Sequence, residues 1–229
     1  MKQKKLNQTY AALLERDKKD SETDRQIRSK LISAGLEEAT PKRTFKINTG
    51  EVIGVPNVVD LIIKNLAESE RIISLEGKSG CGKSSTARML AEKIGALLFS
   101  LGEIFRYLTY CRINHQTESL VNEIDRLEYR LVNGQTALCK KDKNLTKSLK
   151  GELSKSEIDE AVADIASQIQ VEVIEFVSTE VSGLMKETAK KIVIEGRPLA
   201  LSFLPSDLKI VLFADTKIRA ERRLKQNLG

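Results

Sequence analysis

Residues 72–84 of the chain read IISLEGKSGCGKS, a short apolar run followed by a glycine-rich segment that ends in a lysine and a serine. The run 72–76 has the composition of a strand buried in a parallel sheet. Residues 77–84 fit the pattern G-x-x-x-x-G-K-[ST] at every fixed position, and residues 84–94 read as a helix. A strand, a glycine-rich loop and a helix in this order form the context in which the pattern binds phosphates. We therefore expect a nucleoside triphosphate site at this loop.

The phosphate-binding role of such a loop has a physical basis. Its glycines let successive backbone N–H groups point inward, and the N-terminus of the next helix adds the positive end of its dipole. In this pattern Lys83 reaches the β- and γ-phosphates, and the Ser84 hydroxyl ligates Mg²⁺. Cys81 is expected to be a small filler residue within the loop, with a redox-sensitive thiol as the alternative.

The composition is that of a globular protein able to bury a core. The chain has 229 residues, of which 41% are apolar and 31% charged, and a net charge of +6. The sequence contains no apolar run long enough for a membrane span and no signal-peptide core after its basic first residues. Cys81, Cys111 and Cys139 are far apart and form no CxxC pair, which fits a reducing cytosol. We expect a cytoplasmic protein without membrane contact.

Two function classes are disfavoured by the residue counts. His115 is the only histidine, which argues against a histidine metal site and a Ser-His triad. Tryptophan is absent and aromatic residues make up 4% of the chain, so a stacking platform for single-stranded nucleic acid is not expected. The positive charge is spread along the chain with both signs mixed, which fits nucleic-acid binding poorly and fits a lysine-rich surface or a phosphate site better.

From residue 71 onward the pattern is that of an α/β protein. Further strands are expected at 96–99, 191–195 and 208–213, and helices at 103–110, 156–190 and from 216. Strands that alternate with helices predict a parallel sheet covered on both faces. Between the runs 127–132 and 135–139, Asn133-Gly134 predicts the tight turn of a β-hairpin.

The first 68 residues are expected to form a helical extension to a P-loop core over residues 69–229. Apolar residues at helical spacing predict a first helix, and Ser21-Glu22-Thr23-Asp24 resembles a capping box that opens a second one. Gly35 would end that second helix, and Pro56 would lie in the first turn of a third. This extension could bind a partner, pack against the core or mediate self-association.

Further blocks of sequence follow the phosphate loop in a fixed order. They are LAEKIG at 90–95, SLGEIFRYLT at 100–109, the hairpin with LTKSLK at 145–150, VIEGR at 193–197, LPSDLKI at 204–210 and RAERRLKQ at 219–226. Together with the loop they resemble, in family order, the bacterial cytidylate (CMP/dCMP) kinases. The resemblance implies a P-loop NTPase fold whose parallel sheet is flanked by helices, with a hairpin-bearing insertion that binds the nucleoside monophosphate. It also implies phosphoryl transfer from ATP, with Mg²⁺, to a nucleoside monophosphate such as CMP or dCMP.

The same resemblance implies a role for individual residues. Arg106 and Arg197 would hold the acceptor phosphate and, with Lys83, form the catalytic set. Glu195 would join Ser84 in ordering Mg²⁺ and its water. The residues implied in ATP binding are Gly77, Lys78, Ser79, Gly80, Cys81, Gly82, Lys83, Ser84 and Ser85 of the loop, with Arg222 and Arg223 near the lid.

The sequence departs from the family pattern at several positions. Pro198 replaces an aspartate, and Glu172 aligns with an arginine, both of which contact the base in the family. A proline side chain accepts no hydrogen bond and a glutamate reverses the donor pattern, so the base preference is expected to be relaxed or shifted. Leu101 and Phe105 replace hydroxyl-bearing residues near the acceptor phosphate. The chain also stops in or before the family's arginine-rich lid, which predicts weak or absent turnover.

Two alternatives to a nucleoside monophosphate kinase stay open at this point. One is a degenerate module that binds ATP without turnover, which the altered base contacts and the missing lid motivate. The other is a P-loop kinase for another small acceptor. The hairpin insertion favours a nucleotide over a sugar as the acceptor.

Overall fold

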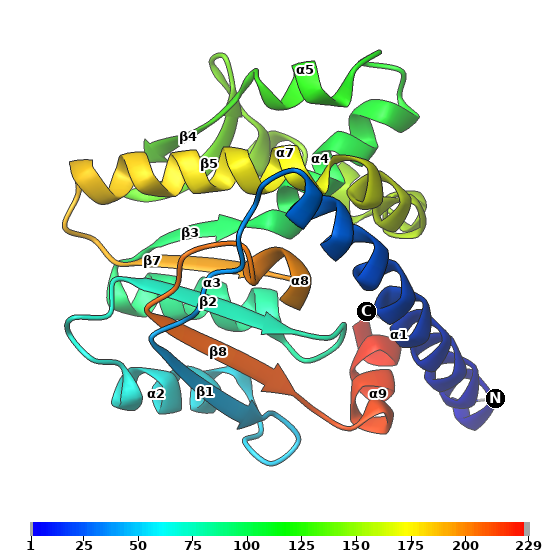
Figure 1. The fold of residues 1–229 in the computed structure, drawn as a ribbon. Helices are drawn as coiled ribbons and strands as arrows, with labels where there is room; N and C mark the ends of the chain where they lie inside the picture. The colour runs from blue at the N-terminus through cyan, green and yellow to red at the C-terminus, as the bar shows by residue number, and fades with distance from the viewer. Residues whose placement is uncertain (1, 227–229) are drawn as a thin grey trace.

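Five parallel strands form the central sheet of the molecule, in the order β1-β8-β2-β7-β3 (Figure 1). The fold is taken from a computed structural model that describes residues 2–226. The strands are β1 (Arg43–Asn48), β2 (Ile72–Gly77), β3 (Leu97–Ser100), β7 (Ile192–Gly196) and β8 (Leu208–Phe213). The strand that precedes the phosphate loop, β2, lies at the centre of the sheet, so the loop starts at the middle of the carboxyl edge.

Helices cover both faces of the sheet, as the alternating pattern predicts. One face packs against α2 (Val55–Asn65) and α3 (Lys83–Ile94), which bury Val59, Ile62 and Leu90 completely. The other face packs against α4 (Leu101–Ile113), α7 (Ser156–Glu187) and α8 (Pro198–Leu201). Burial on both faces explains why β2 and β7 read as continuous apolar runs.

The insertion between α4 and α7 contains the expected hairpin. It consists of α5 (Leu120–Ile124), β4 (Leu127–Val132), β5 (Gln135–Lys140), β6 (Lys143–Asn144), α6 (Leu145–Ser148) and the short 3₁₀ helix η1 (Glu152–Ser154). Asn133 and Gly134 have φ angles of 52° and 78°, and Val132 pairs with Gln135 across the turn. These positive angles are those of the tight hairpin turn that Asn-Gly favours.

The N-terminal segment begins with one continuous helix, α1 (Lys2–Ser33), so the prediction of two helices separated at Ser21 is wrong. The Ser21 hydroxyl donates a hydrogen bond to the Asp17 carbonyl, 2.9 Å away, and so caps no new helix. Because residues 2–33 contain neither glycine nor proline, nothing interrupts the helical ladder. The expected stop is confirmed: Gly35 has a φ of 87° and the Leu36 N–H bonds to the Leu31 carbonyl.

The rest of the N-terminal segment is not all helical, because it contributes β1 to the central sheet. β1 pairs with β8 in parallel from Arg43↔Leu208 to Asn48↔Phe213. Residues 43–65 therefore build one edge of the same sheet and its helical cover, with Pro56 in the first turn of α2 as expected. At the opposite end of the chain, α9 (Thr216–Gln226) follows β8 and packs against α1 (Figure 1).

Within residues 2–226, none of the helices combines the length and the apolar character that crossing a membrane requires.

Candidate functional site

The phosphate loop joins the end of β2 to α3 at the carboxyl edge of the sheet. Gly77 has a φ of 151°, and a Cβ at this position would lie 2.3 Å from the Leu212 carbonyl oxygen. Gly80 has a φ of 83° and lies against the backbone of Arg219. The loop therefore adopts its compact shape because these positions carry no side chain. Gly82 is the N-cap of α3, so the loop's backbone leads directly into the helix N-terminus.

The side chains that follow the loop meet an acidic residue from β7. Glu195 is buried, and its Oε1 accepts hydrogen bonds from Ser84 Oγ at 3.2 Å and from Ser100 Oγ at 2.6 Å. Ser100 also caps α4 by accepting from the Glu103 N–H. The ends of β3 and β7 and the start of α3 thus place hydroxyl and carboxylate oxygens together beside the loop.

Lys83 lies at the same place with its ammonium directed back over the loop. Its Nζ donates to the Lys78 carbonyl oxygen at 3.3 Å. Removal from water lowers the pKa of Lys83, and the Glu195 carboxylate opposes that shift. A desolvated cation of this kind gains most from a bound polyanion, because phosphate charges would replace the lost solvation.

One cavity of about 890 Å³ brings the predicted site residues together. All nine loop residues from 77 to 85 line it, as do Arg106, Arg197, Arg222, Arg223 and Glu195. A cavity with a phosphate loop at one wall and arginines at another can hold two phosphate-bearing ligands. The structure thus brings the predicted residues to one cavity, and their individual roles stay predictions.

Three of the predicted arginines have carboxylate partners in the cavity wall. Arg106 donates to the Leu153 carbonyl at 2.7 Å and to Asp159, while Arg223 donates to the other oxygen of Asp159 at 3.2 Å. Arg197 donates to Asp20 at 2.9 Å. All three side chains keep partial exposure toward the cavity, so they can exchange these carboxylates for a ligand.

Arg222 is held differently from these three. It donates to Thr49 Oγ1 at 2.8 Å and to the Gly80 carbonyl at 3.4 Å. It therefore ties the end of β1 to the phosphate loop, in addition to lining the cavity. Arg219, which the sequence analysis did not select, is 2% exposed and donates to the Ser79 carbonyl at 3.2 Å.

Sequence reasoning also missed the contribution of α1, which forms one wall of the cavity. Its inward stripe advances by alternating steps of four and three residues and reads Leu13, Asp17, Asp20, Asp24, Ile27 and Leu31. The apolar members at both ends are buried, and the aspartates between them line the cavity. Carboxylates on an otherwise apolar stripe are the signal that could have indicated a cationic surface beneath the helix.

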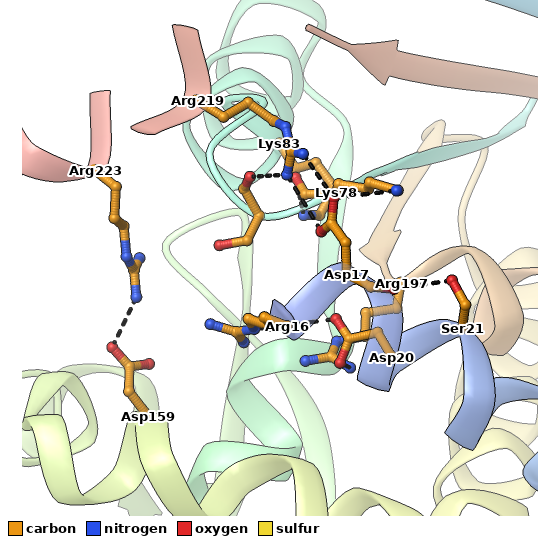
Figure 2. Close-up of polar contacts among 11 residues, drawn as sticks. Arg16, Asp17, Asp20, Ser21, Lys78, Lys83, Asp159, Arg197, Arg219 and Arg223 are labelled. Atoms are coloured by element: carbon orange, nitrogen blue, oxygen red, sulfur yellow. Dashed lines mark hydrogen bonds and ion pairs between the residues drawn. The ribbon is translucent and has the colours of Figure 1, made fainter. Parts of the chain in front are cut away.

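Asp17 makes the strongest contacts of this stripe. Its carboxylate accepts from Arg219 Nη2 at 2.6 Å and from Lys78 Nζ at 3.1 Å (Figure 2). Burial alone would raise the pKa of Asp17, but the hydrogen bonds from Arg219 and Lys78 outweigh it and hold the pKa below its ordinary value. Ion pairs with the phosphate loop and α9 therefore fasten α1 across the cavity.

We expect Asp17→Asn to destabilise the protein by about 1–3 kcal/mol at pH 7, because it leaves the buried Arg219 without its charged partner. A carboxyl whose pKa is depressed on folding stabilises the protein above its unfolded pKa of ~3.9, and this contribution is lost as the pH falls through the folded pKa. The difference in free energy of unfolding between wild type and variant should be constant above about pH 5 and shrink toward zero in more acidic solution. Denaturant titrations across this pH range measure the difference in free energy of unfolding. Asp125→Asn, at an exposed aspartate, serves as the control. A difference that is absent at pH 7, or that does not change with pH, contradicts this role for Asp17.

Three of the positions at which the sequence departs from the family pattern line the cavity. They are Pro198, expected near the base, and Leu101 and Phe105, expected near the acceptor phosphate. Glu172 does not line it, so its expected place beside the base is wrong. A non-helical residue within α7, Ile169, interrupts the helix, and the cavity-lining residues nearest to it are Ser167 and Gln170. The other α7 residues that line the cavity come earlier in the helix and are Val162, Ala163, Asp164 and Ala166. The alignment of Glu172 with an arginine of the family did not account for this interruption of α7.

The donor set beside the loop suits magnesium bound together with a nucleotide. The hydroxyl of Ser84 and the carboxylate of Glu195 are hard oxygen donors 3.2 Å apart. Over the described residues there is no group of three or more histidine, cysteine or acidic side chains that could hold an ion without help. Such a site fits a magnesium ion that completes its shell with phosphate oxygens and water, which is its usual mode of binding.

Comparison with known proteins gives consistent matches. A family model described as cytidylate kinase matches residues 73–229. The cytidylate kinase of Mycoplasmopsis synoviae (strain 53) is 30% identical over 161 residues, which cover 68% of this chain and 70% of that protein. The cytidylate kinase of Mesomycoplasma hyopneumoniae (strain 232) is 31% identical over 163 residues, which cover 68% and 67%. That of Lactococcus lactis subsp. cremoris (strain SK11) is 30% identical over 164 residues, which cover 69% and 70%.

Proposed function

The chain belongs to the cytidylate kinase family and is a nucleoside monophosphate kinase, and on this premise we propose that it transfers the γ-phosphate of ATP to CMP or dCMP in the cavity beneath α1. One observation carries the proposal: a single cavity is lined both by the complete phosphate loop and by Arg106 and Arg197. Two phosphate sites that face a common space are what transfer between two nucleotides requires.

On the donor side, the backbone N–H groups of the loop and Lys83 would bind the β- and γ-phosphates of ATP. Ser84 and Glu195 would hold Mg²⁺, which when bound would neutralise negative charge on the phosphates. The ammonium of Lys83 then lies where negative charge spreads over the moving phosphoryl group, and it stabilises that charge in a site shielded from water.

On the acceptor side, Arg197 and Arg106 would hold the phosphate of the monophosphate opposite the loop. An oxygen of this phosphate forms the new bond to the γ-phosphorus, and the bond from that phosphorus to the β-bridging oxygen breaks, giving ADP and CDP. Because a phosphate monoester is largely dianionic near pH 7, its oxygen needs no general base. This agrees with the position of His115, which does not line the cavity.

The wall on which the base would lie differs from the family pattern. Pro198 offers no side-chain hydrogen bond, while α7 presents the hydroxyl of Ser167, the amide of Gln170 and the exposed carboxylate of Asp164. A neutral amide and a hydroxyl can each turn to donate or accept, so they distinguish cytosine from uracil less strongly than a fixed carboxylate. We therefore propose a relaxed preference among pyrimidine monophosphates.

A coupled ADP-release assay tests this function. We expect turnover with CMP and dCMP, weaker turnover with UMP by on the order of tenfold, and the least with AMP. Reactions without monophosphate measure hydrolysis, which should be slow by comparison. ATP binding without turnover of any monophosphate would contradict the kinase activity, and a preference for CMP over UMP of several thousandfold would contradict the relaxed base choice.

The three cysteines are unpaired and buried, which supports a further proposal that the protein works in the reducing cytoplasm.

Self-association through the N-terminal segment stays a prediction. Its first helix already packs against α7 and α9 of its own chain.

A further inference from the structure

The structure assigns Arg16 of α1, which lies outside the segment matched by the family model, to the binding of the acceptor phosphate. This assignment rests on the proposed function, since it adds a residue to the same site. It concerns a helix outside residues 73–229, the segment that the family model matches, and it gives α1 a role in substrate binding beyond covering the cavity.

The first argument is the place of Arg16 in a chain of alternating charges. Each of two carboxylates contacts two arginines from different parts of the fold. Asp159 binds Arg106 and Arg223, while Asp20 binds Arg197 and lies 4.0 Å from Arg16 Nε. Figure 2 shows Arg16 between the Arg223–Asp159 pair and the Arg197–Asp20 pair.

The second argument is that this cluster carries an excess of positive charge. Four guanidiniums contact only two carboxylates, and Asp24, which also lines the cavity and acts on Arg197, offsets part of the difference. The positive charge that remains favours an anion such as the phosphate of the acceptor. Burial lowers the pKa of Arg16, repulsion from Arg197 and Arg223 adds to the shift, and Asp20 and Asp159 oppose it only in part. A bound dianion would relieve that repulsion.

The third argument is that Arg16 has the least satisfied side chain of the four. Arg106, Arg197 and Arg223 each donate a hydrogen bond to a carboxylate, whereas the contact of Arg16 with Asp20 is an ion pair at 4.0 Å. About a third of the Arg16 side chain is exposed, and it lines the cavity. Its guanidinium is therefore free to form a paired contact with phosphate oxygens, for which its planar donors are suited.

The fourth argument is that α1 is held firmly enough to fix the position of Arg16 beside the cavity. Asp17, the next residue, is tied to Arg219 and Lys78, and Leu13 is buried one turn earlier. The position of the Arg16 backbone is thus fixed relative to the phosphate loop and α9. An arginine on a fixed helix binds with less loss of freedom than one on a mobile segment.

The test compares Arg16→Ala with Arg16→Lys and with the control Arg28→Ala. Arg28 lies on the same helix, is exposed and pairs with Glu38 outside the cavity. We expect Arg16→Ala to weaken binding of CMP roughly tenfold or more in calorimetry and to raise the KM for CMP equally. Binding of Mg-ATP, and binding of cytidine, which lacks the phosphate, should stay unchanged. Arg16→Lys should recover part of the loss, and Arg28→Ala should behave as wild type.

Each outcome of this comparison separates the inference from the proposed function. Unchanged CMP binding in Arg16→Ala overturns the assignment, even if the wild type turns over CMP. An equal loss of CMP, ATP and cytidine binding also overturns it, because that pattern indicates a disturbed helix. A faster kcat after the substitution overturns it too, since α1 would then hinder the reaction. If the wild type binds CMP without turnover while Arg16→Ala binds it more weakly, the proposed function fails and the assignment stands. If the wild type binds no CMP, both fail.

Discussion

Lys83→Ala is expected to lower kcat for phosphoryl transfer by on the order of a thousandfold and to weaken Mg-ATP binding. The Lys83 ammonium lies over the phosphate loop, partly stripped of water, beside the oxygens of Glu195 and Ser84. Alanine removes the cation that lies at the start of α3 beside these oxygens, where it can stabilise charge on the moving phosphoryl group. Steady-state kinetics with CMP and calorimetry with Mg-ATP measure the two effects.

The matched control for this substitution is Lys93→Ala. Lys93 lies in the last turn of the same helix, α3, and pairs with the exposed Asp60 at 2.7 Å. This variant should keep the activity and ATP affinity of the wild type. Thermal melts should show that both variants fold, because within residues 2–226 the only hydrogen bond of the Lys83 side chain is to a loop carbonyl. Unchanged Mg-ATP affinity in Lys83→Ala would contradict the assignment of the loop.

Arg197→Ala is expected to raise the KM for CMP by about 10- to 100-fold with little change in the Kd for Mg-ATP. The reason is that a hydrogen bond between two charged groups contributes about 1.5–3 kcal/mol. Arg197 follows β7 and faces the cavity opposite the phosphate loop, where Asp20 is its carboxylate partner. Arg197 suits the test better than Arg106, since Arg106 also bonds to the Leu153 carbonyl and its loss would disturb the insertion.

Arg130→Ala provides the control for the acceptor side. Arg130 lies on the hairpin, is exposed and pairs with Glu128. Its removal should leave both kinetic constants unchanged. If Arg197→Ala weakened ATP binding as strongly as CMP binding, or left both unchanged, the division of the cavity into a donor and an acceptor side would be wrong.

The phosphate loop and the elements around it could be predicted from sequence because their signals are local. The loop, its glycines and the strand and helix on either side lie within residues 72–94, so their contacts follow from spacing in the chain. The Asn133-Gly134 turn was predictable for the same reason, since the turn type depends on two residues.

Edge strand β1 was not predicted because it lacks a buried apolar run. Of its six residues only Ile47 is fully buried, and Arg43, Thr44 and Lys46 are exposed. Residues of this kind form a strand when a partner strand, here β8, offers its free edge. That partner lies some 160 residues away in the sequence, beyond the reach of local patterns.

The part of the site that α1 contributes was not predicted because it depends on where the helix crosses the fold. Asp17 and Asp20 are unremarkable charged residues in a helix rich in both signs. They acquire a role only because packing of Leu13, Ile27 and Leu31 places them against Lys78, Arg219 and Arg197. Their spacing along the inward stripe was readable, but the cations beneath it come from three other segments.

Transfer of label from ATP carrying ³²P in its γ-phosphate tests the central claim most directly. After incubation with CMP and Mg²⁺, the products are separated and the label is located. We predict that the wild type transfers the label to CDP and that Lys83→Ala does not. The control variant Lys93→Ala should form as much labelled CDP as the wild type. Label that remains in ATP, or that appears in inorganic phosphate and not in CDP, would contradict the account.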